Sequence, residues 1–209
     1  MTAVPYEPGS TAELLVGPYY DFLSENGKLW PMVGQVAAAT GTVANMRAVV
    51  AAAREAKMKI FFVPHHRWAS GDFDGWRFPT PSQQGAGRYQ VFGKDTWGGS
   101  FHQDFPVCDR GVVVAERWAQ SGFSGTDLDQ QLRQHGTDHV IVIGMMANTC
   151  VESTARYPME LGYHVTLVTD ATAAASADAM RAAHAVNGPT YAHEITDTRS
   201  LLADLAVPG

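Results

Sequence analysis

The chain has 209 residues, of which 45% are hydrophobic and 17% are charged. This length and this apolar share suit one domain with a full core and predict an ordered chain. Fifteen Lys and Arg stand against 21 Asp and Glu, which gives a formal net charge of −6. A chain this acidic is poorly suited to neutralising phosphates, so a nucleic-acid-binding role is disfavoured.

Cysteine content and the first residues bear on the compartment. Cys108 and Cys150 are the only cysteines, too few for a disulfide framework, and they fit a reducing compartment. Residues 1–8 contain no basic residue and no apolar core, so no signal peptide is expected. No apolar run approaches the length of a membrane span. We therefore expect a cytoplasmic protein that does not act at a membrane.

Apolar runs of strand length alternate with helix-length patterns along the chain. In chain order we expect strands at 13–16, 59–63, 111–114, 139–143, 163–168 and near Tyr191, and helices at 42–57, 126–135, 150–161, 176–186 and 198–205. Such alternation implies right-handed crossovers and a parallel sheet covered on both faces. The prediction is a single α/β domain over residues 1–209, with three α/β/α layers around a central parallel sheet.

Residues 68–105 interrupt this pattern with an irregular insert rich in Gly, Pro, Trp and His. A long irregular insert in a compact α/β domain is usually a binding loop. Most of its aromatic side chains are expected to pack the loop onto the domain, while one or two form an apolar wall for a ligand. The candidates for a substrate pocket, including two tyrosines after the first strand, are Tyr19, Tyr20, Trp76, Trp97 and Phe101.

The residues that follow the predicted strands are candidates for a site, because ligands of an open parallel sheet bind beyond the carboxyl ends of its strands. The stretch 144–152 is the most informative, since it runs from a strand through a Gly-led turn to Cys150 at a helix start. Exposed N–H groups and the helix dipole favour the thiolate form there. The backbone N–H groups of Met146 and Cys150 can hold an oxyanion. The alternative is a buried structural cysteine.

Several short motifs occur in a fixed order along the chain: 18–19 with 21–23, 27–31, 96–99, 101–102 with 104–105, and the turn at 144–152. With them the chain resembles the isochorismatase-like cysteine hydrolases over nearly its whole length, in particular the branch that includes streptothricin-hydrolase-like proteins. The resemblance implies a three-layer α/β fold, a homo-oligomer (a dimer or tetramer), a small-molecule substrate and no cofactor.

The resemblance also implies a catalytic triad, of which two members are replaced. The family's usual triad is an Asp ending the first strand, a Lys ending the third, and a Cys at a helix start. The Asp deprotonates the Cys, the Lys steadies both charges, and an acyl-enzyme forms and is hydrolysed. Here Gly17 stands where the Asp belongs and Ala115 where the Lys belongs, so only Cys150 remains. Tyr20, where the family has Asn, is a third departure.

Three explanations of these replacements stay open: an enzyme inactivated or engineered for study, a natural homologue with repurposed chemistry, and a pseudoenzyme that binds a ligand. If Cys150 is still a nucleophile, ordinary hydrolysis is expected to be weak, because the Asp and Lys are missing. A lyase, cyclase or isomerase reaction is then favoured, since it needs fewer proton transfers. Replacement proton carriers would come from Glu116, Asp21, His65, His66 and His102. For the histidines the alternative is a hydrogen-bonded loop residue.

A metal site is not expected. Nicotinamidase-like relatives hold a metal with an Asp and several His near this region. This chain lacks the carboxylate-x-His element, and the adjacent pair His65 and His66 is poor evidence for one site.

Overall fold

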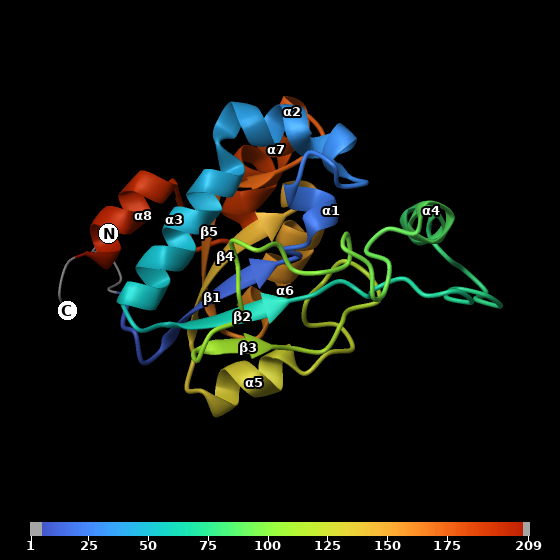
Figure 1. Cartoon of the computed structure of the whole chain (residues 1–209). Helices are drawn as coiled ribbons and strands as arrows, with labels where there is room; N and C mark the ends of the chain where they lie inside the picture. The colour runs from blue at the N-terminus through green and yellow to red at the C-terminus, as the bar shows by residue number, and fades with distance from the viewer. Residues whose placement is uncertain (1–5, 207–209) are drawn as a thin grey trace.

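The computed structural model describes residues 6–206. Its core is one six-stranded sheet in the order β3-β2-β1-β4-β5-β6, and every pair of neighbouring strands is parallel. The strands are β1 (Thr11–Val16), β2 (Lys59–Val63), β3 (Gly111–Val113), β4 (His139–Met145), β5 (His164–Ala173) and β6 (Glu194–Thr196). The expected central parallel sheet is therefore confirmed (Figure 1). The expectation of no signal peptide concerns residues 1–8, of which 1–5 lie outside the described residues.

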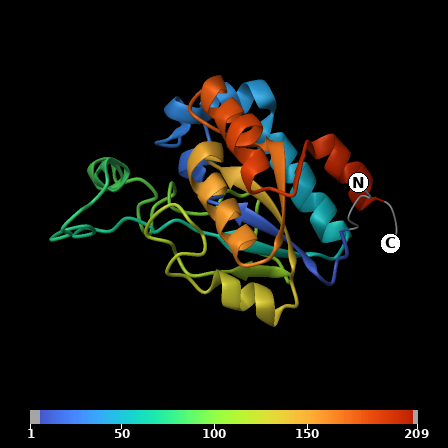
Figure 2. The same cartoon turned by 180° about the vertical axis from the view of Figure 1, so that it is seen from behind.

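Helices cover both faces of the sheet, giving the three layers (Figures 1 and 2). One apolar cluster joins the sheet to α1 (Tyr20–Leu23), α2 (Trp30–Thr40), α3 (Thr42–Glu55) and α8 (Thr198–Leu205). The second joins the other face to α5 (Leu128–Gln134) and to the helical run formed by η1 (Ala147–Val151) and α6 (Glu152–Glu160). Among the described residues no single helix suffices to cross a membrane by length and hydropathy, although the bent pair α2 and α3 passes that test together.

The strand order places a ligand site by topology. Strands β1, β2 and β3 follow one another toward one edge of the sheet, and β4, β5 and β6 toward the other edge. The order therefore switches between β1 and β4, which lie side by side at the centre of the sheet. In open α/β sheets, ligands bind in the crevice at such a switch point, beyond the carboxyl ends of the strands. Gly17 follows β1 and η1 follows β4, so the stretch that carries Cys150 begins at this crevice.

Several elements differ from the expectations. The helix expected at 176–186 is instead α7 (Ala177–Arg181) followed by η2 (Ala182–Asn187) and η3 (Gly188–Thr190). The short strand expected near Tyr191 is β6, a few residues later. Helices α1 and α2 were not expected, and α4 (Pro81–Tyr89) lies inside the supposedly irregular insert. The capping box of Thr80 and Gln83 begins α4, but this helix buries no residue and so lacks an apolar stripe that a sequence pattern could show.

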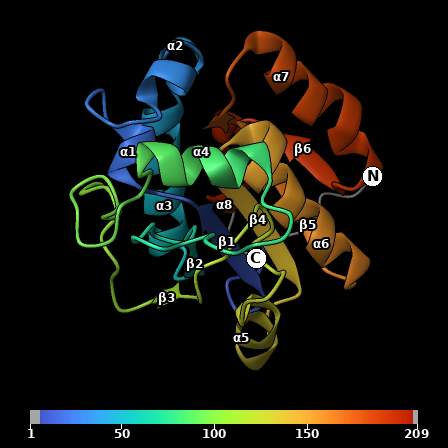
Figure 3. The ribbon, with the colours of Figure 1, turned by 90° about the vertical axis from the view of Figure 1, so that its right-hand side faces the viewer.

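The insert anchors itself to the domain through Asp21. This side chain is buried, and its Oδ2 accepts a hydrogen bond of 2.7 Å from the N–H of Phe92 while Oδ1 accepts one of 3.0 Å from the N–H of Lys28. Beyond this anchor, α4 and its flanking loops project from the domain and lie across the carboxyl edge of the sheet (Figures 1 and 3). Asp21 therefore acts as a structural tie between the first loop and the insert.

We expect Asp21→Ala to lower the free energy of unfolding by about 3 kcal/mol, because it leaves the buried N–H of Phe92 without an acceptor. Urea unfolding of the variant and the parent measures the difference. Asp109→Ala removes an exposed carboxylate and serves as the control, with an expected change below about 0.5 kcal/mol. Equal stabilities of the two variants would contradict this role for Asp21.

Candidate active site

Two glycines lie where the ends of β1 and β4 meet. Gly17 ends β1 with a positive φ of 61°, and its N–H donates a hydrogen bond of 3.1 Å to the carbonyl of Val63 at the end of β2. Gly144 lies near the end of β4 with φ 119°, where a Cβ would lie 2.1 Å from the carbonyl oxygen of Val16. Only glycine allows this approach of the two backbones. The Gly-led turn seen in the sequence thus brings the end of β4 against the end of β1.

Cys150 lies in the first turns of the helical run that follows β4. The run begins at Met146, whose carbonyl accepts hydrogen bonds from the N–H groups of Thr149 and Val151. The bond from Val151 spans five residues, so η1 is π-helical, a local form that is frequent at functional sites. Helix starts leave N–H groups without intrahelical partners, which suits the oxyanion role expected for Met146 and Cys150.

The Cys150 side chain is 8% exposed and belongs to the apolar cluster that also contains Val16, Val63 and Val114. Cys108 is exposed and also free, and its thiol donates to the carbonyl of Pro106. The two thiols therefore occupy opposite environments in one chain.

A cavity of about 540 Å³ opens at the same edge of the sheet. It is lined by Tyr19, by Pro64 and Arg67 after β2, and by residues 99–101 and 113–116. The pocket candidates Tyr19 and Phe101 and the two positions Ala115 and Glu116 thus meet in one cavity. Cys150 is not in its lining, nor in that of a second cavity of about 290 Å³ beside Lys28 and Lys94, within the described residues. Val114 connects the two features, since it lines the cavity and belongs to the cluster of Cys150.

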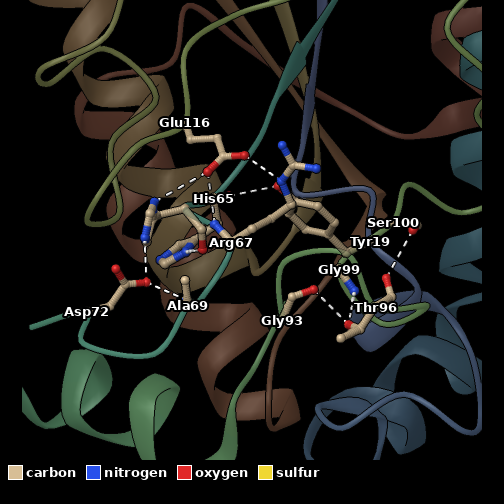
Figure 4. A network of polar contacts seen from close by, with 11 residues as sticks. Tyr19, His65, Arg67, Ala69, Asp72, Gly93, Thr96, Gly99, Ser100 and Glu116 are labelled. Atoms are coloured by element: carbon tan, nitrogen blue, oxygen red, sulfur yellow. Dashed lines mark hydrogen bonds and ion pairs between the residues drawn. The ribbon is translucent and has the colours of Figure 1, made fainter.

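The rim of the cavity carries a network of ion pairs (Figure 4). Glu116 accepts hydrogen bonds from the backbone N–H and from the Nε of Arg67. His66 lies between two carboxylates, with its Nδ1 3.3 Å from Glu116 and its Nε2 2.7 Å from Asp72, and its ring stacks on Trp118. These contacts occupy Glu116 and His66 at the rim, so their role in the described structure is to order it.

His65 contacts Tyr19 and does not belong to the ion pairs of the rim. The Tyr19 hydroxyl donates a hydrogen bond of 2.7 Å to the carbonyl of His65, and Nδ1 of His65 lies 3.0 Å from the carbonyl of His66. Burial, helped by the charge of Arg117, lowers the pKa of His65 to about 4. The imidazole is therefore neutral at neutral pH, and its Nε2 is an acceptor while Nδ1–H faces the carbonyl.

The remaining aromatic candidates lie outside the described cavity. Tyr20 stacks on Trp97 with ring centroids 4.6 Å apart, and its hydroxyl accepts from the N–H of Gln103. Trp76 is 42% exposed on the projecting part of the insert, next to Trp118. His102 is buried, and its Nδ1 accepts from the N–H of Asp104. These side chains hold the insert together, as most of its aromatic residues were expected to do.

Arg117 is the residue that the sequence analysis missed. Its side chain is 1% exposed, and its Nη1 donates a hydrogen bond of 2.7 Å to the carbonyl of Val63, the group that also accepts from the N–H of Gly17. Arg117 and Gly17 thus share one backbone acceptor at the end of β2. Ala115 instead lines the cavity, and its N–H donates to Asp127.

The pairing beyond β3 is irregular. Phe62 pairs with Val113 and His65 with Arg117, so the four-residue step from Val113 to Arg117 matches the three-residue step from Phe62 to His65. One extra residue breaks the two-residue alternation of a strand and changes which side chain points inward. The only sequence signal was an arginine within the short stretch 115–117.

No cluster of three or more His, Cys, Asp or Glu side chains suited to a metal ion occurs within residues 6–206. The network at the rim contains charged groups of both signs that already pair with one another.

Comparison with known proteins decides the family. The model of the isochorismatase domain matches residues 14–199, which include the second half of β1, all of β4 and the helical run with Cys150. The chain belongs to the isochorismatase family. It is therefore an enzyme of the hydrolase type, built on the fold that the motifs in the sequence implied.

Individual relatives of this isochorismatase-family chain are distant. It is 27% identical to ureidoacrylate amidohydrolase RutB of Serratia proteamaculans, over 99% of this chain and 87% of the relative. A cysteine hydrolase from Pseudomonas syringae pv. phaseolicola has the same fold, with a TM-score of 0.77, 22% identity and 98% of each chain covered. N-carbamoylsarcosine amidase from Thermoplasma acidophilum superposes with a TM-score of 0.69 and 25% identity, covering 90% of this chain and 96% of that one.

Proposed function

We propose that the chain cleaves the C–N bond of a small amide or carbamoyl compound, with Cys150 as the nucleophile. The observation that carries this is the position of Cys150, at the start of a helical run beyond β4 and at the switch point of the sheet. The proposal is supported by two relatives, one named an amidohydrolase and the other an amidase.

The proposed reaction has two steps. The sulfur of Cys150 attacks the carbonyl carbon, so a C–S bond forms and the C–N bond breaks, and the thiol proton passes to the leaving amine. Water then attacks the thioester, which releases the acid and restores the thiol. Backbone N–H groups at the start of η1 would stabilise the oxygen that becomes negative in each step.

The triad of this member is proposed to be incomplete. Gly17 has no side chain that could take the thiol proton, and the buried cation beside it is Arg117 rather than a lysine at position 115. A guanidinium does not give up its proton in proteins. Unless another group takes the thiol proton, amides are therefore expected to react slowly. A lyase, cyclase or isomerase step, which moves fewer protons, is the alternative use of the same thiol.

The reactivity of the two thiols tests the proposal. Iodoacetamide is added near neutral pH, and the alkylation of each cysteine is followed by peptide mass spectrometry. We expect Cys150 to react at least about tenfold faster than Cys108 despite its burial, because the N–H groups and the positive end of a helix start favour attack by a sulfur placed there. Cys108 is the internal control, since it is free and exposed.

A Cys150 that reacts no faster than Cys108 would contradict the nucleophile. The chain would then be a protein that binds a small molecule without turnover.

A further inference from the structure

The cavity at the carboxyl edge of the sheet is mainly apolar and carries one ion pair in its wall. Most of the wall consists of aromatic and aliphatic side chains: Tyr19, Pro64, Phe101, Val113, Val114 and Ala115. The two charged side chains of the wall are Arg67 and Glu116. The hydroxyls of Tyr19 and Ser100 are already used, since both donate to backbone carbonyls. A ligand in this cavity therefore finds its side-chain donor at the ion pair.

Arg67 is held in place and still has donors to offer. Its backbone N–H and its Nε both donate to the carboxylate of Glu116, and its Nη1 and Nη2 have no hydrogen-bond partner among residues 6–206. Figure 4 shows the guanidinium between this carboxylate and the ring of Tyr19, which lines the same cavity. The Arg67 side chain is 43% exposed, so a ligand can reach it. The terminal N–H groups of a fixed guanidinium are thus available at the cavity wall.

The carboxylate that holds Arg67 is itself held by the rim. Glu116 lies 3.3 Å from Nδ1 of His66, and Nε2 of His66 lies 2.7 Å from Asp72. The ring of His66 stacks on Trp118 with centroids 3.6 Å apart. A donor that is oriented before binding costs little conformational entropy when the ligand arrives. The rim network therefore prepares Arg67 for a ligand.

The charge of Arg67 is already balanced. The hydrogen bond to Glu116, together with the charges of Glu116 and Asp95, raises the pKa of Arg67, so the guanidinium stays protonated. A ligand carboxylate at Nη1 and Nη2 would bring a further negative charge close to these two carboxylates. Its repulsion from them offsets much of its attraction to Arg67. An uncharged carbonyl oxygen accepts the same hydrogen bonds without that repulsion.

We propose that this cavity binds an uncharged carbonyl group of the substrate, an amide or carbamoyl compound, on the terminal nitrogens of Arg67. The apolar wall takes up the body of the ligand, so the chain prefers uncharged amides to acids of the same shape. Arg67 is a specificity-determining residue and takes no part in bond breaking, because Cys150 is not in the lining. This inference rests on the proposed function for the reaction that follows, but the binding itself does not need the thiol.

Benzamide and benzoate provide the test, because they have nearly the same shape and only benzoate is charged. Their dissociation constants are measured by NMR titration with the Cys150→Ala chain, which removes turnover from the measurement. We expect benzamide to bind at least about fivefold more tightly than benzoate, since only the acid is repelled by Glu116 and Asp95.

Three further substitutions in the same chain assign the preference to its source. Arg67→Met removes the donors and should weaken the binding of benzamide about tenfold. Glu116→Gln removes the balancing charge and should shift the preference toward benzoate at least about fivefold. Ala115→Trp fills the cavity from its wall and should abolish the binding of both compounds. Arg88→Met, on the exposed helix α4, is the matched control and should leave both dissociation constants unchanged.

The outcomes separate this inference from the proposed function. No binding of benzamide, benzamide binding that Arg67→Met or Ala115→Trp leaves unchanged, or benzoate bound as tightly as benzamide would each overturn the inference. An unchanged preference in Glu116→Gln would overturn it as well, because the charge of Glu116 would then not set the selectivity. None of these results bears on the thiol. The proposed function is overturned instead by a Cys150 that reacts with iodoacetamide no faster than Cys108 in the parent chain.

Discussion

Cys150→Ala is expected to lower turnover by about 10³-fold or more, because removal of a covalent nucleophile leaves only binding and backbone stabilisation of the transition state. The assay is ammonia release from a panel of small amides and ureido compounds, each offered with and without a carboxylate. The comparison uses the compound that the parent turns over fastest. The loss should appear in kcat, with KM nearly unchanged, because a methyl group preserves most of the site's shape.

Cys108→Ala is the matched control, since it removes an exposed thiol that donates only to the carbonyl of Pro106. We expect this variant to retain the turnover of the parent. Activity that survives Cys150→Ala would instead point to catalysis by hydrogen bonding and pocket shape, and would contradict the nucleophile.

Glu13→Gln is expected to change how the stability of the protein depends on pH. Glu13 is fully buried in the central strand β1, and both of its carboxylate oxygens lack hydrogen-bond partners. Burial raises the pKa of this group from 4.5 to about 8, an effect that Arg54 reduces only in part. The folded chain therefore holds a proton that the unfolded chain loses above its lower pKa.

The sign follows from this difference in bound protons. The contribution of Glu13 to the free energy of unfolding should be largest below pH 4.5 and fall as the pH rises to about 8. The loss over that window is on the order of 5 kcal/mol, at about 1.4 kcal/mol for each pKa unit. Glutamine cannot ionise, so Glu13→Gln should match the parent in acid and become the more stable protein at pH 8 to 9.

Urea unfolding at a series of pH values measures this effect. Glu55→Gln removes an exposed carboxylate from α3 and should give a curve parallel to that of the parent. If Glu13→Gln also followed the parent across the whole range, Glu13 would not titrate as a buried group.

The sequence predicts the strands and helices well where a run of apolar residues or a helix cap marks them. The apolar runs that became β2 and β4 are continuous, and a strand buried on both faces requires such a run. The last helix was predicted with the bounds that it has, 198–205, because Asp197 caps it and it has an apolar face. Helix α4 was missed because none of its residues is buried, so local capping rather than packing begins it.

The candidate site was predictable in part. Cys150 and Gly17 follow strands whose ends meet at the switch point, and topology alone brings them to one crevice. Arg117 was not found, because the irregular pairing after β3 leaves no pattern in the sequence. The partners of Glu116 and Asp21 were equally hidden, since Arg67 and Phe92 approach them across long stretches of chain. Such contacts depend on the path of the insert, which no short pattern in the sequence encodes.

A covalent intermediate on Cys150 is the most direct test of the account. The chain is mixed with the panel compound that it turns over fastest, quenched with acid within the first turnovers, and mapped by peptide mass spectrometry. We predict an adduct with the mass of the acyl group on the peptide that contains Cys150, absent from Cys150→Ala. Product that accumulates while both cysteines stay free, or an adduct on any other residue, would contradict it.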